Sequence, residues 1–473
     1  MLWTCLHFPD LCLQLFLRGA MDRQATVVSS ISNRPDVLAC NAAAIRRGIA
    51  PGMSIAAALA LDSELKVYVR DELAEVRALE SIATWAGQFS PTISIAPPTC
   101  VLVEIGGCLD YFHGFGNLLD KIESGLLELG YAAVTATAST PTAACLLGRA
   151  GCSVHLSKPD SLNNALRPLP IALLQSAREA LATLHGLGVH TLGDVLHLPA
   201  DGLARRFGQA LLDEIRRALG ELPDPQRAFI PPTRYHNHVE LPAPVGEMEP
   251  LMFAANRLLL ELCGFLRARG AGVTRLELEL LHEDAPLTRL GLGLAATRDA
   301  EHMRCVLRER LGQTKLADRV EALSLIAEEI IPLASVDGEF FPGAEKDSEA
   351  VTQLVERLRA RLGDAAVTGL RPHCDHRPER AWRCMEPGAP TQSAADLPIG
   401  VRPSLLLRKP RPLREGLAAC SLDLVSGPER FEAGWWDGED VGRDYFVAKR
   451  NAGERFWIFR DRQGEWFLHG VFA

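Results

Sequence analysis

The chain has 473 residues, of which 47% are hydrophobic and 23% are charged. This length exceeds one hydrophobic core and predicts roughly three or four domains. The net charge of -9 argues against a surface that binds nucleic acid as a whole, because phosphate neutralisation needs clustered lysine and arginine. No run approaches the ~18 to 20 apolar residues of a membrane span, and the apolar N-terminus lacks the pattern of a signal peptide. We therefore expect a cytoplasmic protein with no membrane contact.

The twelve cysteines are scattered and form no CxxC pair. In a chain of this size they indicate reduced, mostly buried thiols rather than a disulfide framework. The segment "HCDH" (373–376) comes nearest to a metal cluster, but it lacks the paired spacing of a zinc site. We expect neither a metal nor a cofactor.

Residues 1–165 alternate short apolar runs with alanine-rich helical patterns, which predicts a mixed α+β or α/β domain. Within it, "PPTCVLVEIGG" (97–107) is typical of a buried strand bounded by prolines and glycines. Residues 166–228 have helical periodicity. A tight turn at Gly186, Gly188 and Thr191 joins two of these helices, and its amides can hold a phosphate; a simple helix connection is the alternative.

The second half begins with a proline-punctuated linker (229–237), which a small α+β domain (238–333) follows. Residues 334–350 form a polar break around Phe340 and Phe341, and such paired aromatics either fold back or serve as docking anchors. The last 48 residues contain four of the seven tryptophans and alternate around two turns. They predict a small antiparallel sheet, whose aromatic density favours a compact core over a ligand-stacking platform.

The order of these segments resembles the Y-family translesion DNA polymerases. "VLACNAAAIRRGIAPGMSIAAALAL" is similar to their fingers, "GLGVHTLGDVLHLPADGLARRFG" to their thumb and "FSPTISIAPPTCVLVEIGG" to their palm. The resemblance implies a multidomain α+β fold. Palm and fingers would occupy 1–165 (fingers about 20–80), a helix-hairpin-helix thumb 166–228, a little finger 238–333, and a C-terminal region ending in a small β-rich module 351–473.

Polymerase chemistry requires two Mg²⁺ ions about 3.5 to 4 Å apart, held by carboxylates. The resemblance places the acids of the first strand on His7 and Pro9, and the adjacent acidic pair of the palm strand on Thr99 and Cys100. None of these residues offers an anionic oxygen. We therefore expect a catalytically degenerate site.

Three nearby carboxylates are poor substitutes. Glu104 lies four residues, or about 13 Å, beyond Cys100 along the strand. Asp10 is one residue from Pro9, a shift that turns a strand side chain to the opposite face. Asp110 lies beyond the glycine turn.

The positions that would bind the nucleotide also differ from those of the family, as the metal-binding positions do. By the resemblance, the aromatic residue and arginine of the fingers map onto Ala42 and Ile45, and Thr140 and Pro141 stand where the family presents Asn and Lys. Metal and phosphate ligands are lost together while the glycines of the scaffold remain, which favours a protein released from catalysis.

Degenerate Y-family proteins of the ImuB type share further segments with this chain, including "HRPERAWR" (376–383) and "GPERFEAGWWDGEDVGRDYF" (427–446). This resemblance implies a non-catalytic adaptor of a bacterial damage-induced mutagenesis complex. Its partners would be the beta sliding clamp, an ImuA-type RecA-like protein and an error-prone C-family DNA polymerase. The alternatives are an active lesion-bypass polymerase with displaced carboxylates and a regulator that binds DNA structures without these partners.

The resemblance also implies contact residues. Glu339, Phe340 and Phe341 stand where family members carry a clamp-binding peptide, and "QLVERL" (353–358) is the weaker candidate because it continues as an amphipathic helix. In the C-terminal region, the possible partner anchors are Trp435, Trp436 and Trp466, for which core packing is the stronger interpretation. We expect weak DNA binding, through the turn at Gly186, Gly188 and Thr191 and through basic residues of the little finger.

Overall fold

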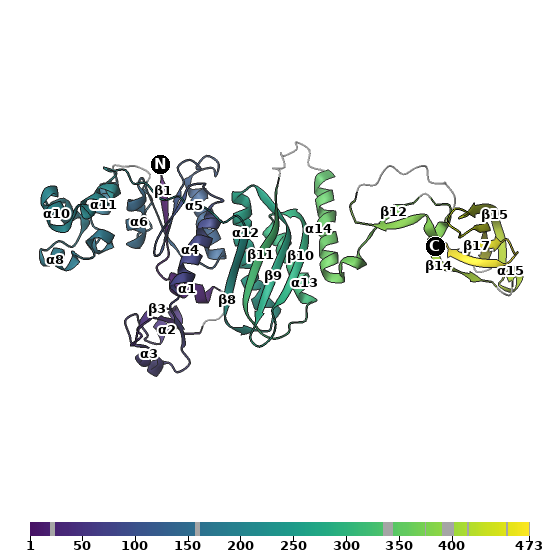
Figure 1. Ribbon diagram of the computed structural model, residues 1–473, viewed down its shortest axis with the longest axis horizontal. Coiled ribbons are helices and arrows are strands. Elements are labelled where there is room, and N and C mark those ends of the chain that lie inside the picture. The colour runs from purple at the N-terminus through teal and green to yellow at the C-terminus, as the bar shows by residue number, and fades with distance from the viewer. Residues whose placement is uncertain are drawn as a thin grey trace. The chain divides into compact units, whose positions relative to one another are not determined.

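The computed structural model describes residues 1–18, 24–156, 161–333, 344–373, 375–389, 402–413, 416–450 and 453–472, with only the backbone at 344–349, 416 and 419. The chain divides into two compact units, Met1–Arg361 and Leu362–Ala473. The structure contains several small sheets and many helices, which confirms the prediction of a multidomain α+β fold (Figure 1). None of the described helices is long and apolar enough to cross a lipid bilayer.

The region predicted as the palm contains an antiparallel sheet of strand order β5-β6-β1-β7, and the names palm, fingers, thumb and little finger below refer to the predicted regions. Helices cover both of its faces, so every residue of β1 and all of β6 except its last residue are buried, as expected of strands with nearly continuous apolar sequence. One face packs against α6, and the other packs against α4 and α5. The elements are β1 (Trp3–His7), α1 (Leu11–Leu17), α4 (Glu72–Ala86), β5 (Ile93–Ala96), β6 (Cys100–Glu104), α5 (Phe115–Glu128), β7 (Val134–Ala138) and α6 (Pro141–Arg149).

The fingers form a separate three-stranded sheet of order β3-β2-β4 with its own small apolar core. Asn41 and Ser54 begin its two helices, and each side chain accepts a hydrogen bond from a helical amide. The elements are β2 (Thr26–Ser29), β3 (Val37–Cys40), α2 (Ala42–Arg46), α3 (Ile55–Leu61) and β4 (Lys66–Val69).

The regular elements of the thumb among its described residues are helices, and they share one hydrophobic core with α6 of the palm. It contains α7 (Leu162–Leu166), the 3₁₀ turns η2 (Ile171–Leu173) and η3 (Gln175–Ala177), α8 (Leu181–Gly186), α9 (Leu192–Leu196), α10 (Ala200–Phe207) and α11 (Gln209–Leu219).

The little finger is an antiparallel sheet of order β10-β9-β11-β8, packed against α12 and α13 through leucine-rich faces. Its first strand begins at Tyr235, so the end of the predicted linker is already paired in this sheet. The elements are β8 (Tyr235–Val245), α12 (Met248–Ala268), β9 (Ala271–His282), β10 (Thr288–Thr297), α13 (Ala300–Gly312), β11 (Val320–Pro332) and then α14 (Ala344–Leu362).

Within the first unit, the little finger is joined to the palm through α12 and α4. Trp85 of α4 lies against Gly125 and Gly264, where an added Cβ would stand 2.5 Å from its ring at either glycine. Beside this contact Arg18 and Glu261 form a buried ion pair, with side chains 6% and 2% exposed. Because glycine has no Cβ, Gly125 and Gly264 allow their helices to approach Trp85 this closely.

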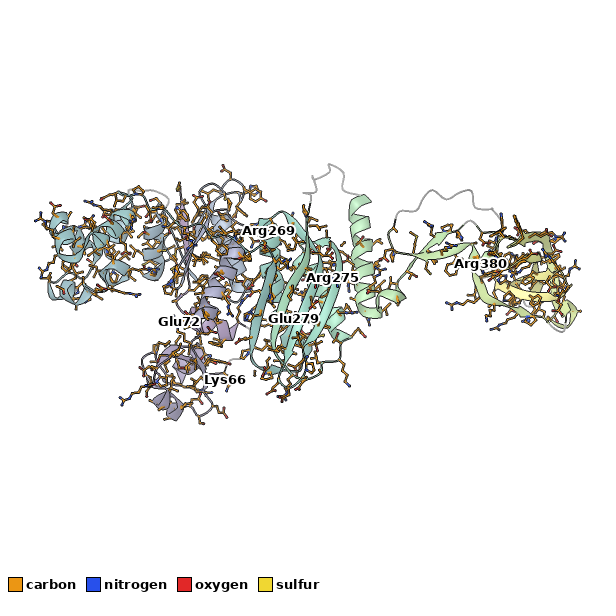
Figure 2. All side chains as sticks on the ribbon, viewed as in Figure 1. Lys66, Glu72, Arg269, Arg275, Glu279 and Arg380 are labelled. Atoms are coloured by element: carbon orange, nitrogen blue, oxygen red, sulfur yellow. The ribbon has the colours of Figure 1, made fainter. Side chains whose placement is uncertain are left out.

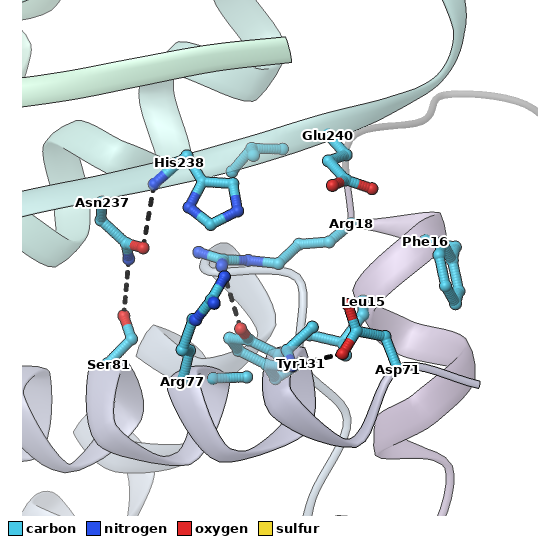
Figure 3. Close-up of a pocket in the computed structure, with 13 residues that line it drawn as sticks. Leu15, Phe16, Arg18, Asp71, Arg77, Ser81, Tyr131, Asn237, His238 and Glu240 are labelled. Carbon is cyan, nitrogen blue, oxygen red and sulfur yellow. Dashed lines mark hydrogen bonds between the residues drawn. The ribbon is translucent and has the colours of Figure 1, made fainter. Parts of the chain in front are cut away.

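A small polar pocket of about 70 Å³ lies at the same joint, among α1, α4 and β8 (Figure 3). Arg18 and Arg77 point into it, and Asn237 donates to Ser81 Oγ at 2.8 Å. It contains none of the residues predicted to form a catalytic or DNA-binding site.

The second unit holds the β12–β13 hairpin and a five-stranded antiparallel sheet of order β14-β18-β17-β16-β15. The predicted C-terminal sheet is therefore present, and β14 adds an edge strand that its sequence did not indicate. The elements are η4 (Asp364–Ala366), β12 (Gly369–Pro372), η5 (Pro378–Arg380), β13 (Trp382–Met385), β14 (Leu405–Pro412), α15 (Gly416–Ala419), β15 (Leu422–Ala433), β16 (Val441–Arg450), β17 (Arg455–Asp461) and β18 (Trp466–Val471).

Candidate functional site

The predicted degenerate positions meet at one end of the paired strands β1 and β6. His7 stands directly opposite Cys100 in the register, and the Phe8 amide donates to the Thr99 carbonyl at 2.8 Å. His7 Nδ1 lies 3.1 Å from Thr99 Oγ1 and 3.4 Å from Cys100 Sγ. Pro9 follows as an exposed residue beyond the strand. Imidazole, hydroxyl and thiol groups thus gather at this strand end.

The neighbouring carboxylates lie elsewhere or are engaged. Glu104 is opposite Trp3, at the other end of the same strand pair. Its Oε1 accepts hydrogen bonds from the amides of Leu2 and Gly106, both at 3.1 Å. Asp10 is exposed and stands at the N-terminus of α1. The separation along β6, about 13 Å, is too great for Glu104 to share an ion with Cys100.

Three buried cysteines converge between this sheet and α6. The sulfur atoms of Cys5, Cys100 and Cys145 all lie within 4.8 Å of one another, and among the described residues they are the one group of three or more clustered ligand side chains. Hydrogen bonds from the Cys145 and Cys5 thiols lower the pKa of Cys100, whereas their bonds with Cys100 raise the pKa of Cys5 and of Cys145.

Sequence reasoning missed this cluster. The three cysteines lie on two different strands and a helix, far apart in the chain, so no spacing motif connects them. The available signal was the alternation of Cys5 and His7 along one strand, which places both side chains on the same face.

The predicted nucleotide-pocket positions have structural roles. Ala42 and Ile45 belong to the short helix α2, where Ile45 is 58% exposed. Thr140 begins α6: its hydroxyl accepts from the Ala143 amide at 3.3 Å and donates to the Ala218 carbonyl of α11 at 3.0 Å. Pro141 occupies the first turn of α6, a position that suits its missing amide hydrogen.

The predicted phosphate-binding turn of the thumb is a closed capping motif. Gly188 has φ +77°, which glycine adopts without strain. Thr191 and Asp194 cap each other at the start of α9: Thr191 Oγ1 accepts from the Asp194 amide, and the Asp194 carboxylate accepts from the amides of His190 and Thr191. These backbone hydrogen bonds lower the pKa of Asp194.

Every backbone amide from Leu187 to Gly193 already donates to an oxygen atom of the chain. Gly186 is the last residue of α8. A phosphate would have to displace Asp194 or an internal carbonyl, so the geometry does not by itself offer an anion site at Gly186, Gly188 and Thr191.

One face of β9 in the little finger carries one basic and two acidic residues, Arg275, Glu277 and Glu279. Arg275 and Glu279 are labelled on this strand in Figure 2. Arg275 pairs with Glu328 at 2.7 Å, and Arg289 of β10 pairs with Glu279 at 3.1 Å. Carboxylates of the chain thus engage both arginines, and weak DNA binding stays a prediction.

The predicted tryptophan anchors fall into two environments. Trp435 and Trp436, in the connection after β15, are 78% and 54% exposed and meet edge to face with centroids 5.6 Å apart. Trp466 of β18 packs against Phe446 inside the sheet's apolar cluster. Core packing thus accounts for Trp466 and not for the other two.

An arginine that sequence reasoning left without a role supports this exposed pair. The guanidinium of Arg377, in "HRPERAWR", lies 5.7 Å from the Trp436 ring and donates to the carboxylates of Asp375 and Asp437. These hydrogen bonds and the attached charge lower the pKa of Asp437 to about 2. The loop that carries Trp435 and Trp436 is therefore held by charge-assisted hydrogen bonds from the buried Arg377 to Asp437.

The predicted clamp-binding residues Glu339, Phe340 and Phe341 lie outside the described residues. The alternative segment 353–358 forms part of α14, with Leu354 and Leu358 exposed.

The chain is similar to one family model, to curated relatives and to solved structures. Residues 12–149 match the impB/mucB/samB (IMS) family model. Protein ImuB of Caulobacter vibrioides, in strains NA1000 and CB 15, is 29% identical over 461 residues, covering 90% of this chain and 100% of the relative. Among solved structures, a Dbh ternary complex (16% identity, TM-score 0.40) covers 70% of this chain and 100% of its own, and DinB from Sulfolobus solfataricus (16%, TM-score 0.37) covers 71% and 100%.

Residues 12–149 are therefore similar to the impB/mucB/samB family, and nearly the whole chain is similar to Protein ImuB.

Proposed function

We propose that this chain is a non-catalytic, polymerase-like adaptor of a bacterial damage-induced mutagenesis complex. It links the beta sliding clamp, an ImuA-type RecA-like protein and an error-prone C-family polymerase at damaged DNA, and the C-family polymerase performs the synthesis. The observation that carries the proposal is the end of β1 and β6, where His7, Thr99 and Cys100 lie together without a carboxylate.

The chemistry of these groups argues against two-metal catalysis. Mg²⁺ prefers oxygen ligands in octahedral geometry, and phosphoryl transfer needs anionic oxygens that bridge both ions. An imidazole, a hydroxyl and a thiol do not supply them. The alternative of an active polymerase with displaced carboxylates is also disfavoured, since Glu104 is held by two amides at the far end of the strand.

Primer extension by the purified full-length chain, in Mg²⁺ or Mn²⁺, tests the absence of catalysis. We expect no template-dependent incorporation. Incorporation that disappears in Asp10→Asn or Glu104→Gln would establish the active-polymerase alternative instead.

The clamp contact is tested by pull-down with the sliding clamp. We expect the double variant Phe340→Ala/Phe341→Ala to lose clamp binding, because the anchoring rings are removed. Leu354→Ala/Leu358→Ala, which truncates two exposed leucines in α14, is the matched control and should bind as the wild type does. If the leucine variant loses clamp binding and the phenylalanine variant keeps it, the clamp-binding segment is 353–358 instead.

Assembly of the complex is tested by pull-down of all three protein partners, with and without residues 335–473. We expect the truncated chain to lose them. A full-length chain that binds DNA but none of the three partners would support the DNA-structure-binding regulator.

A further inference from the structure

The palm holds a cluster of soft metal ligands that the adaptor role does not use. Cys5 and His7 alternate along β1, so both side chains point to the face that α6 covers. Cys100 of β6 lies opposite His7, and Cys145 comes from α6. Three structural elements therefore contribute donors to one buried place.

The spacing of the three sulfur atoms is close to that of a tetrahedral zinc site, since they lie within 4.8 Å of one another. His7 Nδ1 is 3.4 Å from Cys100 Sγ but lies outside this group of three. Zinc bound to thiolates at about 2.3 Å holds its sulfurs roughly 3.8 Å apart. Shifts of about an ångström or less would bring the sulfurs onto one ion.

Packing holds these donors in place. The three sulfur-bearing side chains are 0%, 0% and 7% exposed. Gly148 of α6 lies so near β1 that an added Cβ would stand 3.2 Å from Cys5 Sγ and 3.3 Å from His7 Cβ. His7, at the end of its strand and 9% exposed, is the donor nearest to solvent and gives an ion a route of entry.

The charge of such a site would be balanced. Three thiolates and one Zn²⁺ carry a net charge of -1, and Arg149, at the C-terminal end of α6, interacts electrostatically with all three cysteines. Thr99 Oγ1 lies 4.0 Å from Cys100 Sγ and 3.1 Å from His7 Nδ1, so its hydroxyl is a neighbour of two donors. A buried charge needs such partners.

We propose that Cys5, Cys100 and Cys145 form a structural zinc site that ties β1 and β6 to α6, and that the His7 ring, whose Nδ1 is 3.4 Å from Cys100 Sγ, shifts toward the three sulfurs to become the fourth donor. Thiolate and imidazole ligands suit Zn²⁺ and disfavour Mg²⁺, and four protein donors leave no open position for catalysis. The inference goes beyond the adaptor role and holds whether or not the partners bind. It places a closed, soft-metal centre where a working polymerase keeps open, oxygen-lined ones.

The test measures metal directly in the full-length chain, purified in reductant without chelator. Elemental analysis should find zinc equimolar with protein. After zinc removal, Co²⁺ should give the intense thiolate charge-transfer and ligand-field bands of a tetrahedral cysteine site. Chelation should lower the melting temperature, and added Zn²⁺ should restore it.

Variants assign the ligands. Cys100→Ser and Cys145→Ser should lose the zinc and the cobalt spectrum, and His7→Asn should weaken zinc binding at least ~10-fold. Cys263→Ser is the matched control, because Cys263 is an equally buried thiol in α12, outside the cluster. It should keep the metal.

A cysteine variant can also lose zinc because it fails to fold. The cobalt spectrum of the wild-type chain therefore tests the metal site without any variant. A folded wild-type chain that binds no zinc and gives no thiolate bands would overturn the proposal. Intact-mass analysis showing a disulfide between two of the three cysteines in reductant would overturn it as well, and so would equal zinc loss in Cys263→Ser.

Discussion

At the scale of single residues, the paired strands β1 and β6 carry no carboxylate at the end where His7 lies opposite Cys100. His7 reaches the hydroxyl of Thr99 and the sulfur of Cys100, and Glu104 has turned its oxygen to the backbone amides of Leu2 and Gly106. Each polar group is engaged inside the chain, which relieves the cost of burying it.

Thr191 provides a residue-scale prediction about the thumb. Thr191→Ala removes the hydroxyl that caps α9, and we expect a loss of about 1 kcal/mol in the free energy of unfolding. Urea denaturation of the full-length chain measures it. The control is Thr183→Ala, an exposed position inside α8, where alanine is neutral or favourable. Equal losses in both variants would contradict the capping role.

The positions of His7, Thr99 and Cys100 could be predicted because alternation along a strand fixes which side chains share a face. The role of Thr140 and the convergence of the cysteines could not. Both depend on how α6 packs against β1 and α11, a tertiary arrangement that leaves no periodic trace in the sequence.

At the scale of secondary-structure elements, the C-terminal sheet surrounds a buried histidine. His469 of β18 is fully buried, and Tyr445 of β16 lies 2.6 Å from its Nδ1. Burial lowers the pKa of His469 to about 4, although the charge of Glu379 opposes the shift. The folded sheet therefore prefers the neutral imidazole.

This histidine predicts a pH-dependent stability. Since the folded pKa lies below the ordinary value of 6.5, the unfolded chain binds the proton first as the pH falls. The neutral His469 therefore contributes to the free energy of unfolding in full above about pH 6.5. This contribution, on the order of 2 kcal/mol, is lost as the pH falls from 6.5 to 4. Hydrogen exchange of β16 to β18, corrected for intrinsic rates, should follow this loss.

His469→Gln is the control for the pH effect. It removes the titrating group, so the stability of the sheet measured by hydrogen exchange should depend less on pH between pH 6.5 and 4. A slope that is unchanged in this variant would assign the effect to another group.

The loop after β15 predicts a recruitment surface. Trp435→Ala/Trp436→Ala should abolish pull-down of at least one protein partner without lowering the melting temperature, because both rings are largely exposed. Trp382→Ala, another exposed tryptophan of the second unit, is the matched control and should retain binding. Equal binding by both variants would exclude the pair as an anchor.

The predicted strands of this sheet came from aromatic alternation around two turns. Neither β14 nor the exposure of Trp435 and Trp436 followed from that pattern. Alternation identifies a face of a strand, whereas these two tryptophans lie in a connection where Arg377, from a distant segment, fixes their place.

At the scale of the whole molecule, buried polar side chains join the palm to the little finger within the first unit. Arg18 pairs with Glu261 and donates to the Leu129 carbonyl and to Tyr131 Oη at 2.8 and 2.9 Å. Ser81 donates to the same glutamate at 2.8 Å. The joint is a buried polar network rather than a sliding surface.

A double-mutant cycle tests the ion pair at this joint. Arg18→Met leaves Glu261 buried without its cation and should cost about 3 kcal/mol in the free energy of unfolding. Arg18→Met/Glu261→Met should lose less, because no lone charge remains. Arg304→Met, which breaks an exposed pair with Glu301, is the control and should change stability by less than ~1 kcal/mol. If the double variant is less stable than Arg18→Met, the loss in Arg18→Met does not come from an unpaired Glu261 charge.

The hydrogen bond from Thr140 to the Ala218 carbonyl joins the start of α6 to the last turn of α11. Near the opposite end of α6, Gly148 lies against Cys5 and His7 of β1. One helix of nine residues therefore contacts both the palm sheet and the thumb, and it belongs to the hydrophobic core that the two regions share.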